Sequence, residues 1–102
     1  INDFKGIVPS EFQLSQNYPN PFNPSTVIRY SLPNTSKVVL NIYNSLGQEV
    51  MRLKDETNTA GIYEVQFNSS KLSSGVYFYQ LIAESVDGNK SFTSTKKMIL
   101  MK

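Results

Sequence analysis

The amino-acid sequence predicts an all-β domain, folded as an antiparallel β-sandwich of about seven strands. Apolar residues recur at every second position in several short stretches, and no long stretch shows the 3.6-residue period of an amphipathic helix. Clusters of Pro, Gly, Asn, Asp and Ser separate these stretches and favour turns. The 102 residues are enough for one domain with a hydrophobic core, but not for two. Six or seven short strands in one such domain are typical of two packed sheets.

The first half of the chain is expected to hold a linker and four strands. Residues 1–10 have no clear period and are predicted to be a linker from a preceding part of a longer protein, so the domain should span residues 11–102. Gly47 is expected to adopt a positive φ in a hairpin turn. Strands are predicted near residues 12–14 and over residues 26–32, 38–43 and 48–54, with turns at 33–36 and 44–47 and a polar loop at 55–61.

The second half is expected to hold three more strands. The stretch at residues 76–84 has Tyr77, Tyr79, Leu81 and Ala83 on one face, and its other face is also largely apolar. A strand with two apolar faces is predicted to be central in its sheet. The predicted strands are residues 63–67, 76–84 and a final one within 91–101, joined by a polar connection at 68–75 and an Asp-Gly hairpin turn at 86–89.

A glycine and a tyrosine at the start of the predicted central strand indicate the kind of sandwich. The sequence Leu-Ser-Ser-Gly-Val-Tyr at residues 72–77 places an apolar residue and a glycine turn before Tyr77. Immunoglobulin-like sandwiches have a tyrosine at this kind of corner, with its ring in the core and its hydroxyl bonded to upstream backbone. We therefore predict an immunoglobulin-like fold with a tyrosine corner, and loss of the Tyr77 ring should cost about 3–5 kcal/mol of stability.

The most unusual segment reads Asn-Tyr-Pro-Asn-Pro-Phe-Asn-Pro-Ser-Thr at residues 17–26. Each of its three prolines fixes its own φ, lacks an N–H donor and restricts the residue before it. These properties exclude a helix and disfavour a central strand. The segment is therefore predicted to be a stiff, extended lead-in with unpaired carbonyl groups and two displayed rings, those of Tyr18 and Phe22.

Composition excludes several classes of function. The chain has no histidine and no cysteine, so Ser-His-Asp and Cys-His catalysis and disulfides are impossible within it. The formal net charge is only +2 without a periodic basic stripe, which argues against a nucleic-acid partner. No apolar run approaches the roughly 18 residues of a transmembrane segment. Glu49, Glu64 and Glu84 could in principle supply a catalytic carboxylate pair, and Asp55, Glu56 and Asp87 a metal site, but their spacing requires neither. We therefore predict no catalytic residue, metal or cofactor.

Four segments in a fixed order carry a family resemblance. They are the proline-rich segment at residues 17–26, residues 38–50, residues 72–79 and the final residues 95–102. Together they resemble the type A C-terminal sorting domain of the type IX (Por) secretion system of Bacteroidota and their relatives, over about residues 11–102. Asn44 and Gln48 depart from the commonest family residues, aspartate and arginine, as tolerated turn substitutions.

The resemblance implies a non-catalytic sorting signal that is covalently part of a larger cargo protein. Domains of this family fold in the periplasm, are recognised by the outer-membrane translocon, and are typically removed by a sortase-like peptidase. The cargo is then secreted or attached to the cell surface of a Gram-negative bacterium. Cleavage of this chain is expected within or before residues 1–10.

The resemblance also implies which residues take part in recognition by a partner. The proline motif contributes Pro19, Asn20 and Pro21, and the Gly-x-Tyr motif contributes Gly75 and Tyr77. The basic, apolar terminal motif contributes Lys96, Lys97 and Lys102.

Each motif also has a purely structural interpretation, and these stay open. The prolines can simply terminate an edge strand. The spacing at residues 21–24 also fits a polyproline ligand, which would be a different binding function. Gly75 and Tyr77 can serve the fold alone, and the lysines can protect an edge from strand pairing instead of being read by a partner strand. An alternative function is a structural or carbohydrate-binding accessory domain of a secreted enzyme, with sugar-stacking rings at Tyr18, Tyr43 and Tyr79.

Overall fold

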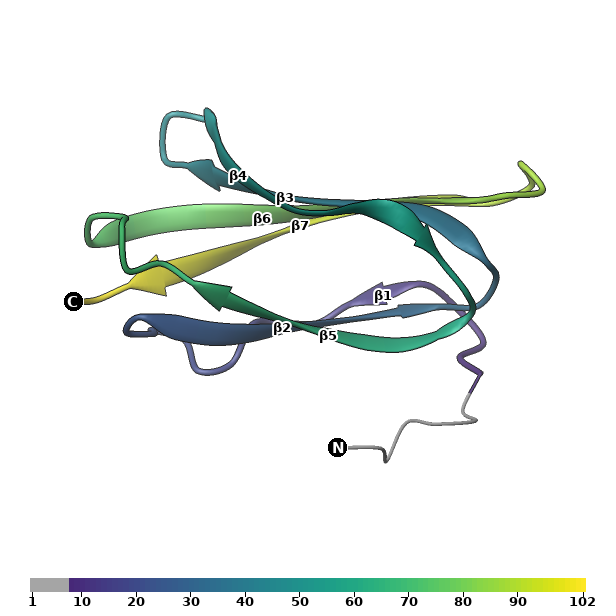
Figure 1. Ribbon diagram of the computed structural model, residues 1–102, viewed down its shortest axis with the longest axis horizontal. Coiled ribbons are helices and arrows are strands. Elements are labelled where there is room, and N and C mark those ends of the chain that lie inside the picture. The colour runs from purple at the N-terminus through teal and green to yellow at the C-terminus, as the bar shows by residue number, and fades with distance from the viewer. Residues whose placement is uncertain (1–7) are drawn as a thin grey trace.

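The computed structural model, which describes residues 8–102, confirms the antiparallel sandwich of seven strands. Figure 1 shows two sheets packed as layers. The smaller sheet has the order β1-β2-β5, and the larger has the order β4-β3-β6-β7. Most of the predicted linker, residues 1–7, lies outside the described residues. The smaller sheet contains β1 (Gln13–Leu14), β2 (Ser25–Leu32) and β5 (Gly61–Asn68), and the larger contains β3 (Ser36–Asn44), β4 (Glu49–Asn58), β6 (Gly75–Ser85) and β7 (Ser91–Leu100).

The core lies between the two sheets and is built from the alternating inward side chains of each strand. The prediction for β6 is confirmed, because this strand lies between β3 and β7 and its inward row is buried. The largest fully buried side chains are Tyr30, Tyr79, Phe22, Phe67, Ile28, Leu32, Leu40, Ile42, Leu81, Met98, Leu100 and Val38. Among residues 8–102, the structure contains no helix with the length and apolar character needed to cross a membrane.

The tyrosine corner is confirmed by its hydrogen bond. The Tyr77 hydroxyl donates to the carbonyl of Ser73, four residues upstream, at 2.8 Å, and the ring is buried. Gly47 has φ +84°, as the predicted hairpin turn requires. These two features agree with the immunoglobulin-like architecture.

The predicted loop at residues 55–61 is wrong, because β4 continues as a strand to Asn58. Its polar residues pair with the first half of β3, where Val38 lies opposite Glu56 and Lys37 opposite Thr57. A strand at the edge of a sheet is exposed to solvent, so polar residues are tolerated there. A run of polar residues can therefore form an edge strand when its backbone pairs with a neighbouring strand.

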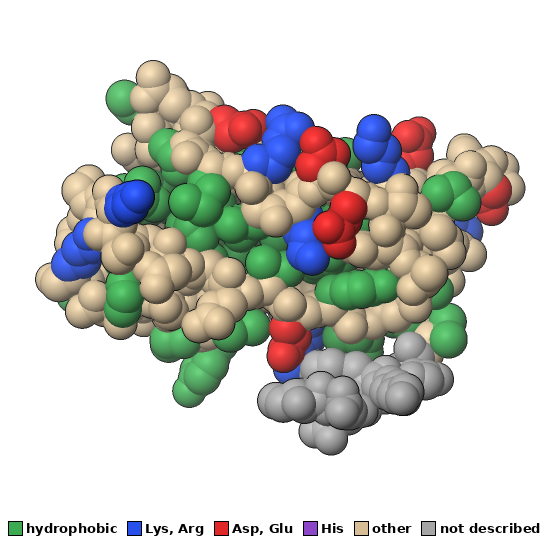
Figure 2. Space-filling view, in the orientation of Figure 1, with side chains coloured by type: hydrophobic (Ala, Val, Ile, Leu, Met, Phe, Trp, Pro, Cys, Tyr) green, Lys and Arg blue, Asp and Glu red, His purple; other side chains and the backbone are tan. Residues whose placement is uncertain are grey.

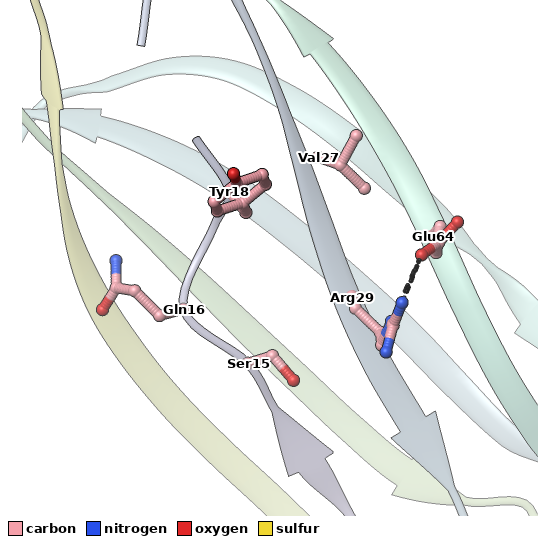
Figure 3. Close-up of a pocket in the computed structure, with 6 residues that line it drawn as sticks. All are labelled: Ser15, Gln16, Tyr18, Val27, Arg29 and Glu64. Carbon is pink, nitrogen blue, oxygen red and sulfur yellow. Dashed lines mark hydrogen bonds and ion pairs between the residues drawn. The ribbon is translucent and has the colours of Figure 1, made fainter. Parts of the chain in front are cut away.

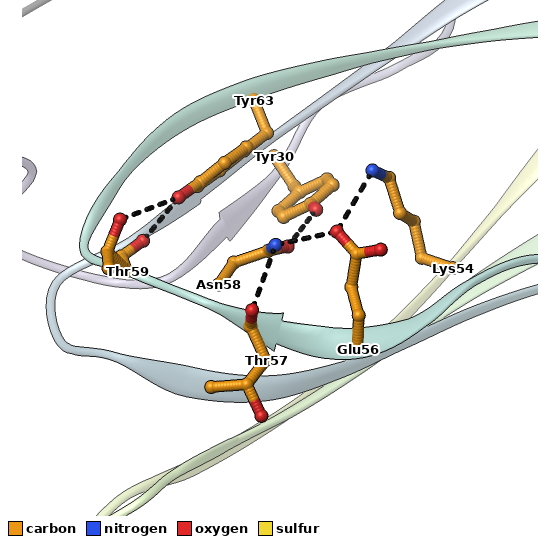
Figure 4. A network of polar contacts seen from close by, with 7 residues as sticks. All are labelled: Tyr30, Lys54, Glu56, Thr57, Asn58, Thr59 and Tyr63. Atoms are coloured by element: carbon orange, nitrogen blue, oxygen red, sulfur yellow. Dashed lines mark hydrogen bonds and ion pairs between the residues drawn. The ribbon is translucent and has the colours of Figure 1, made fainter.

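A polar network fastens the end of β4 to the other sheet (Figure 4). The Tyr30 hydroxyl donates to Asn58 Oδ1 at 2.7 Å, and Asn58 Nδ2 donates to Glu56 Oε2 at 2.8 Å. Lys54 Nζ lies 3.2 Å from the same carboxylate oxygen. The Tyr63 hydroxyl, from β5, donates to the carbonyl of Thr59 at 2.6 Å. Asn58 therefore ends β4 with a bond that joins the two layers.

The proline-rich segment, predicted to be a stiff lead-in to the domain, is instead packed against both sheets. It crosses from one sheet to the other along the side of the sandwich: Tyr18 forms an antiparallel bridge with Val27 in β2, and Phe22 a parallel bridge with Leu100 in β7. All three of its X-Pro peptide bonds are cis. The segment thus closes the side of the domain where β2 and β7 meet.

Candidate functional site

Three of the four predicted motifs meet at one end of the sandwich. Figure 1 shows the C-terminus, the β5–β6 connection and the segment before β2 at the same end, on the left of the view. We call this end the motif pole and define it as residues 17–26, 69–77 and 97–102. The convergence matters because the three segments are far apart in the sequence.

Buried polar side chains hold the proline-rich segment in place. Asn17 is 2 % exposed, and its Nδ2 donates to the carbonyl of Pro19 at 3.2 Å and to Thr26 Oγ1 at 3.0 Å. The Thr26 hydroxyl donates to the same Pro19 carbonyl at 2.9 Å. The Pro19 carbonyl therefore has two donors, and the prediction of unpaired carbonyl groups is wrong there.

Phe22 anchors the segment in the core, which corrects the prediction that its ring is displayed. The side chain is 2 % exposed, and its ring centroid lies 6.0 Å from that of Phe67. Its N–H donates to the carbonyl of Ile99 at 2.9 Å, and its carbonyl accepts from the N–H of Met101 at 3.0 Å. Tyr18, by contrast, is 81 % exposed, as predicted.

Asn20 of the segment and Gln16, the residue just before it, also bond to the backbone of β7. Asn20 Oδ1 accepts from the N–H of Ile99 at 2.9 Å, and Gln16 Nε2 donates to the carbonyl of Lys97 at 2.7 Å. Asn20 therefore links the proline motif to the terminal motif, while Pro19 and Pro21 on either side of it remain exposed. The edge of β7 is covered at this end by the chain itself.

The loop before β6 joins both other parts of the pole. The N–H and hydroxyl of Ser69 donate to the carbonyl of Pro24, at 2.9 and 2.8 Å. Lys102 Nζ donates to the carbonyl of Ser70 at 2.7 Å, and the Lys102 N–H donates to the Ser74 hydroxyl at 3.0 Å. Among the predicted site residues, Lys102 thus has a defined bonding role.

Gly75 and Tyr77 set the shape of this loop. Gly75 has φ +154°, a conformation that other residues rarely adopt, and a Cβ there would meet no atom within 4 Å. The glycine is therefore required by its backbone angle, not by crowding. Tyr77 contributes the buried corner, so both residues act on the pole through its conformation.

The predicted lysines do not form one basic patch. In β7, Lys96 lies opposite Tyr79 and Lys97 opposite Phe78. Tyr79 is in the core, so Lys96 is on the inward face of the sheet and the exposed Lys97 is on the outer face. Lys102 is bonded to the β5–β6 loop. An inward lysine on an edge strand fits the protective interpretation, which leaves Lys97 as the lysine of β7 that faces solvent.

A shallow hollow of about 410 Å³ lies beside the proline-rich segment, on the outer face of the smaller sheet. Figure 3 shows Tyr18 across from Val27, with the Arg29–Glu64 ion pair, 2.7 Å between Nη2 and Oε2, on the neighbouring strands. Ser15 and Gln16 complete its wall. The one large exposed ring in this hollow is that of Tyr18, and the Arg29–Glu64 ion pair joins β2 to β5.

The structure does not assemble a sugar platform from the three tyrosines. Tyr79 is fully buried, and its hydroxyl donates to the carbonyl of Ser15 at 2.6 Å. Burial raises the pKa of this hydroxyl to about 12.

The candidate catalytic carboxylates are separated in the structure. Glu64 pairs with Arg29 on the smaller sheet, whereas Glu49 pairs with Arg52 on the larger sheet. No group of three metal-ligating side chains occurs within residues 8–102.

Comparisons with known proteins agree with this architecture. In solved structures, the chain is similar to CopC from Methylosinus trichosporium OB3b, with 15 % identity, TM-score 0.59 and coverage of 88 % of this chain and 93 % of that one. It is also similar to PorZ of Porphyromonas gingivalis, a surface component of the type IX secretion system, with 18 % identity and TM-score 0.51. That match covers 95 % of this chain but only 13 % of the PorZ chain. At these identities, both likenesses concern the fold.

The family assignment comes from the sequence as a whole. Comparison with curated proteins gives no significant match. The profile of the family described as "secretion system C-terminal sorting domain" matches residues 16–101, which include all of the motif pole except Lys102. The chain therefore belongs to the family of secretion system C-terminal sorting domains, the non-catalytic signals that direct cargo proteins through the type IX secretion system for export.

Proposed function

We propose that the motif pole is the surface by which the outer-membrane translocon recognises this domain. The observation that supports the proposal is the bonding of segments 79 and 81 residues apart into one unit, through Asn20 with Ile99 and Gln16 with Lys97. A translocon that binds the pole contacts the proline, Gly-x-Tyr and terminal motifs together. Recognition then depends on the folded domain.

The residues of the pole divide into two groups under this proposal. Pro19, Pro21 and Lys97 are exposed and offer contacts to a partner. Asn20, Gly75, Tyr77 and Lys102 act by holding the segments in register, through the bonds described above. Lys96 faces inward and protects the edge of β7.

The proposed route follows from family membership. The domain folds in the periplasm while attached to its cargo, and the translocon then exports both across the outer membrane. A sortase-like peptidase removes the domain from the cargo, which is released or attached to the cell surface. The cargo is an unidentified larger protein to which this domain is covalently joined.

A matched pair of variants tests recognition at the pole. The chain is fused to a periplasmic reporter in a bacterium that carries the type IX pathway. One variant combines Lys97→Gln with Met101→Gln at the pole, where Met101 is 58 % exposed. Its control combines Lys90→Gln with Val86→Gln in the β6–β7 hairpin at the opposite end, where Val86 is 64 % exposed.

The pole variant is expected to accumulate in the periplasm, whereas the control is exported like the unmodified fusion. Both variants should keep the unfolding temperature of the parent, because all four side chains are exposed. Equal export of the two variants, with both folded, would show that this surface is not read. A reporter that stays in the periplasm even on the unmodified domain would refute the export role itself.

A further inference from the structure

Three of the four sheet edges are protected against pairing with another strand. On β7, residues 16–22 cover the part of the edge near the motif pole. The edge of β4 carries five charged residues and two register shifts against β3. β1 is only two residues long. Charges, irregular register, shortness and cover are the usual means of blocking an exposed edge.

The fourth edge, on β5, has none of these protections from the residues that the structure describes. β5 is eight residues long, and its register with β2 is continuous from Gly61 to Asn68. It contains no proline, and its single charged residue, Glu64, is already paired with Arg29. Within residues 8–102, no strand pairs with its other edge. Its outward backbone groups can therefore accept an added strand.

A seam of apolar side chains lies next to this free edge, between β5 and the edge strand of the other sheet. Leu53 and Val50 from β4 and Tyr63 and Val65 from β5 are only partly buried against the core. Figure 2 shows hydrophobic side chains gathered between the two sheets on this side, below a row of alternating acidic and basic side chains. An added strand would cover this seam with its inward side chains.

The seam ends in a hollow that carries a positive charge. The hollow, about 330 Å³, lies where β5 ends and is lined by Met51 and by residues 68–72. Met51 is 38 % exposed, and Leu72 is partly buried beside it. Lys71 is exposed in the same wall and makes no ion pair within residues 8–102. The hollow thus offers apolar contact together with an unpaired ammonium group.

We propose that the free edge of β5 and this hollow bind an extended segment of a partner polypeptide as an added antiparallel strand. The segment is uncharged along β5, with alternating apolar side chains on the seam. It carries an apolar residue between Met51 and Leu72 and an acidic residue beside Lys71. This site lies along the side of the sandwich and is separate from the recognition proposed at the motif pole.

Charge favours such a partner over a second copy of the chain. In an antiparallel pair of β5 strands, the end of one strand lies beside the start of the other. The residues there, Thr59, Ala60 and Gly61, carry no charge. Self-pairing would therefore bring no charged residue from the start of β5 to Lys71, whereas an acidic residue of a partner supplies a counter-charge.

The test uses the purified chain and a labelled peptide, acetyl-Glu-Leu-Thr-Val-Thr-Val-Thr-amide, in a fluorescence anisotropy titration. Saturable binding is expected, with slower hydrogen exchange in β5 but not in β4. Lys71→Glu should weaken binding by up to about fivefold, the upper end of the usual range for one exposed charge pair. A peptide with Lys in place of Glu should regain that factor on the Lys71→Glu protein.

The controls separate an added strand from other forms of binding. A peptide methylated on alternate backbone nitrogens should not bind, because it cannot pair with the edge. Lys90→Glu, at the far hairpin, should leave the affinity unchanged. The proposal is overturned if the peptide does not bind, if backbone methylation has no effect, or if sedimentation shows a dimer through β5 that persists in Lys71→Glu.

Discussion

The two lateral sides of this sandwich are closed by different means. On one side, where β2 and β7 meet, a segment of irregular backbone crosses between the sheets and inserts Phe22 into the core; we call this the closed side. On the other side, where β4 and β5 meet, closure depends on side chains, chiefly the network around Asn58 at one end; we call this the open side. A crossing backbone segment buries a large ring and covers a sheet edge, whereas side-chain contacts alone leave an edge and an apolar seam accessible.

The largest expected difference between the two sides is in the apolar contacts. Phe22→Ala should lower the free energy of unfolding by about 3–5 kcal/mol, because it removes a fully buried ring. Leu53→Ala, on the open side, should cost less than half as much, since that side chain is only partly buried. Urea denaturation of both variants measures the difference. Equal losses would mean that the closed side contributes no more to stability than the open side.

The next effect concerns the asparagine on each side. Asn17→Ala should cost about 1–3 kcal/mol, because it leaves the buried Thr26 hydroxyl and Pro19 carbonyl with one partner fewer. Asn58→Ala should cost less, because Asn58 is partly exposed, so water can enter the space that its side chain leaves and bond to the Tyr30 hydroxyl. Chemical denaturation under identical conditions compares the two. A larger loss for Asn58→Ala would contradict the expectation that the asparagine on the closed side contributes more to stability.

The smallest effect at neutral pH is that of the Tyr79 hydroxyl, which faces the closed side. Tyr79→Phe should cost about 0.5–1.5 kcal/mol at pH 7, the usual value of one hydrogen bond. Burial raises the pKa of Tyr79 to about 12, whereas an unfolded tyrosine ionises near pH 10. This contribution to stability is therefore complete below pH 10 and is lost as the pH rises towards 12.

Thermal unfolding between pH 8 and pH 12 checks this dependence. The unmodified chain should lose stability over that range, and Tyr79→Phe should lose less. Burial also raises the pKa of Tyr30 on the open side, so Tyr30→Phe serves as the comparison variant. Parallel pH profiles for the parent and both variants would contradict the role of tyrosine ionisation.

The strands and the tyrosine corner could be predicted because they depend on local patterns. Period-two alternation locates an apolar face, and the glycine before Tyr77 marks a corner whose hydrogen bond spans only four residues. The end of β4 could not be found in this way, since residues 55–58 form a strand through pairing with β3. Polar edge strands are specified by their neighbours more than by their own composition.

The motifs of the candidate site could be located in the sequence, but their arrangement in space could not be predicted from it. The motifs indicated Asn20 and Lys102, yet only the fold shows that Asn20 bonds to β7 and that Lys96 and Lys97 are on opposite faces. Asn17, Gln16 and Ser69 were missed, because their partners are distant or depend on a turn. The one local signal was that Asn17 and Thr26 bracket the prolines, as a pair holding a loop from both ends would.

The bonds between residues 16–22 and 97–102 mean that the motif pole depends on both ends of the domain. A chain that lacks its last six residues has no partner for Asn20 or for the backbone of Phe22, so the pole cannot assemble. Contacts this distant in sequence require the closure of a long loop, and the pairing of the intervening strands brings their two ends together. The pole therefore forms only when the domain is folded with both of its ends in contact. A partner that binds the pole would in this way bind only folded domains.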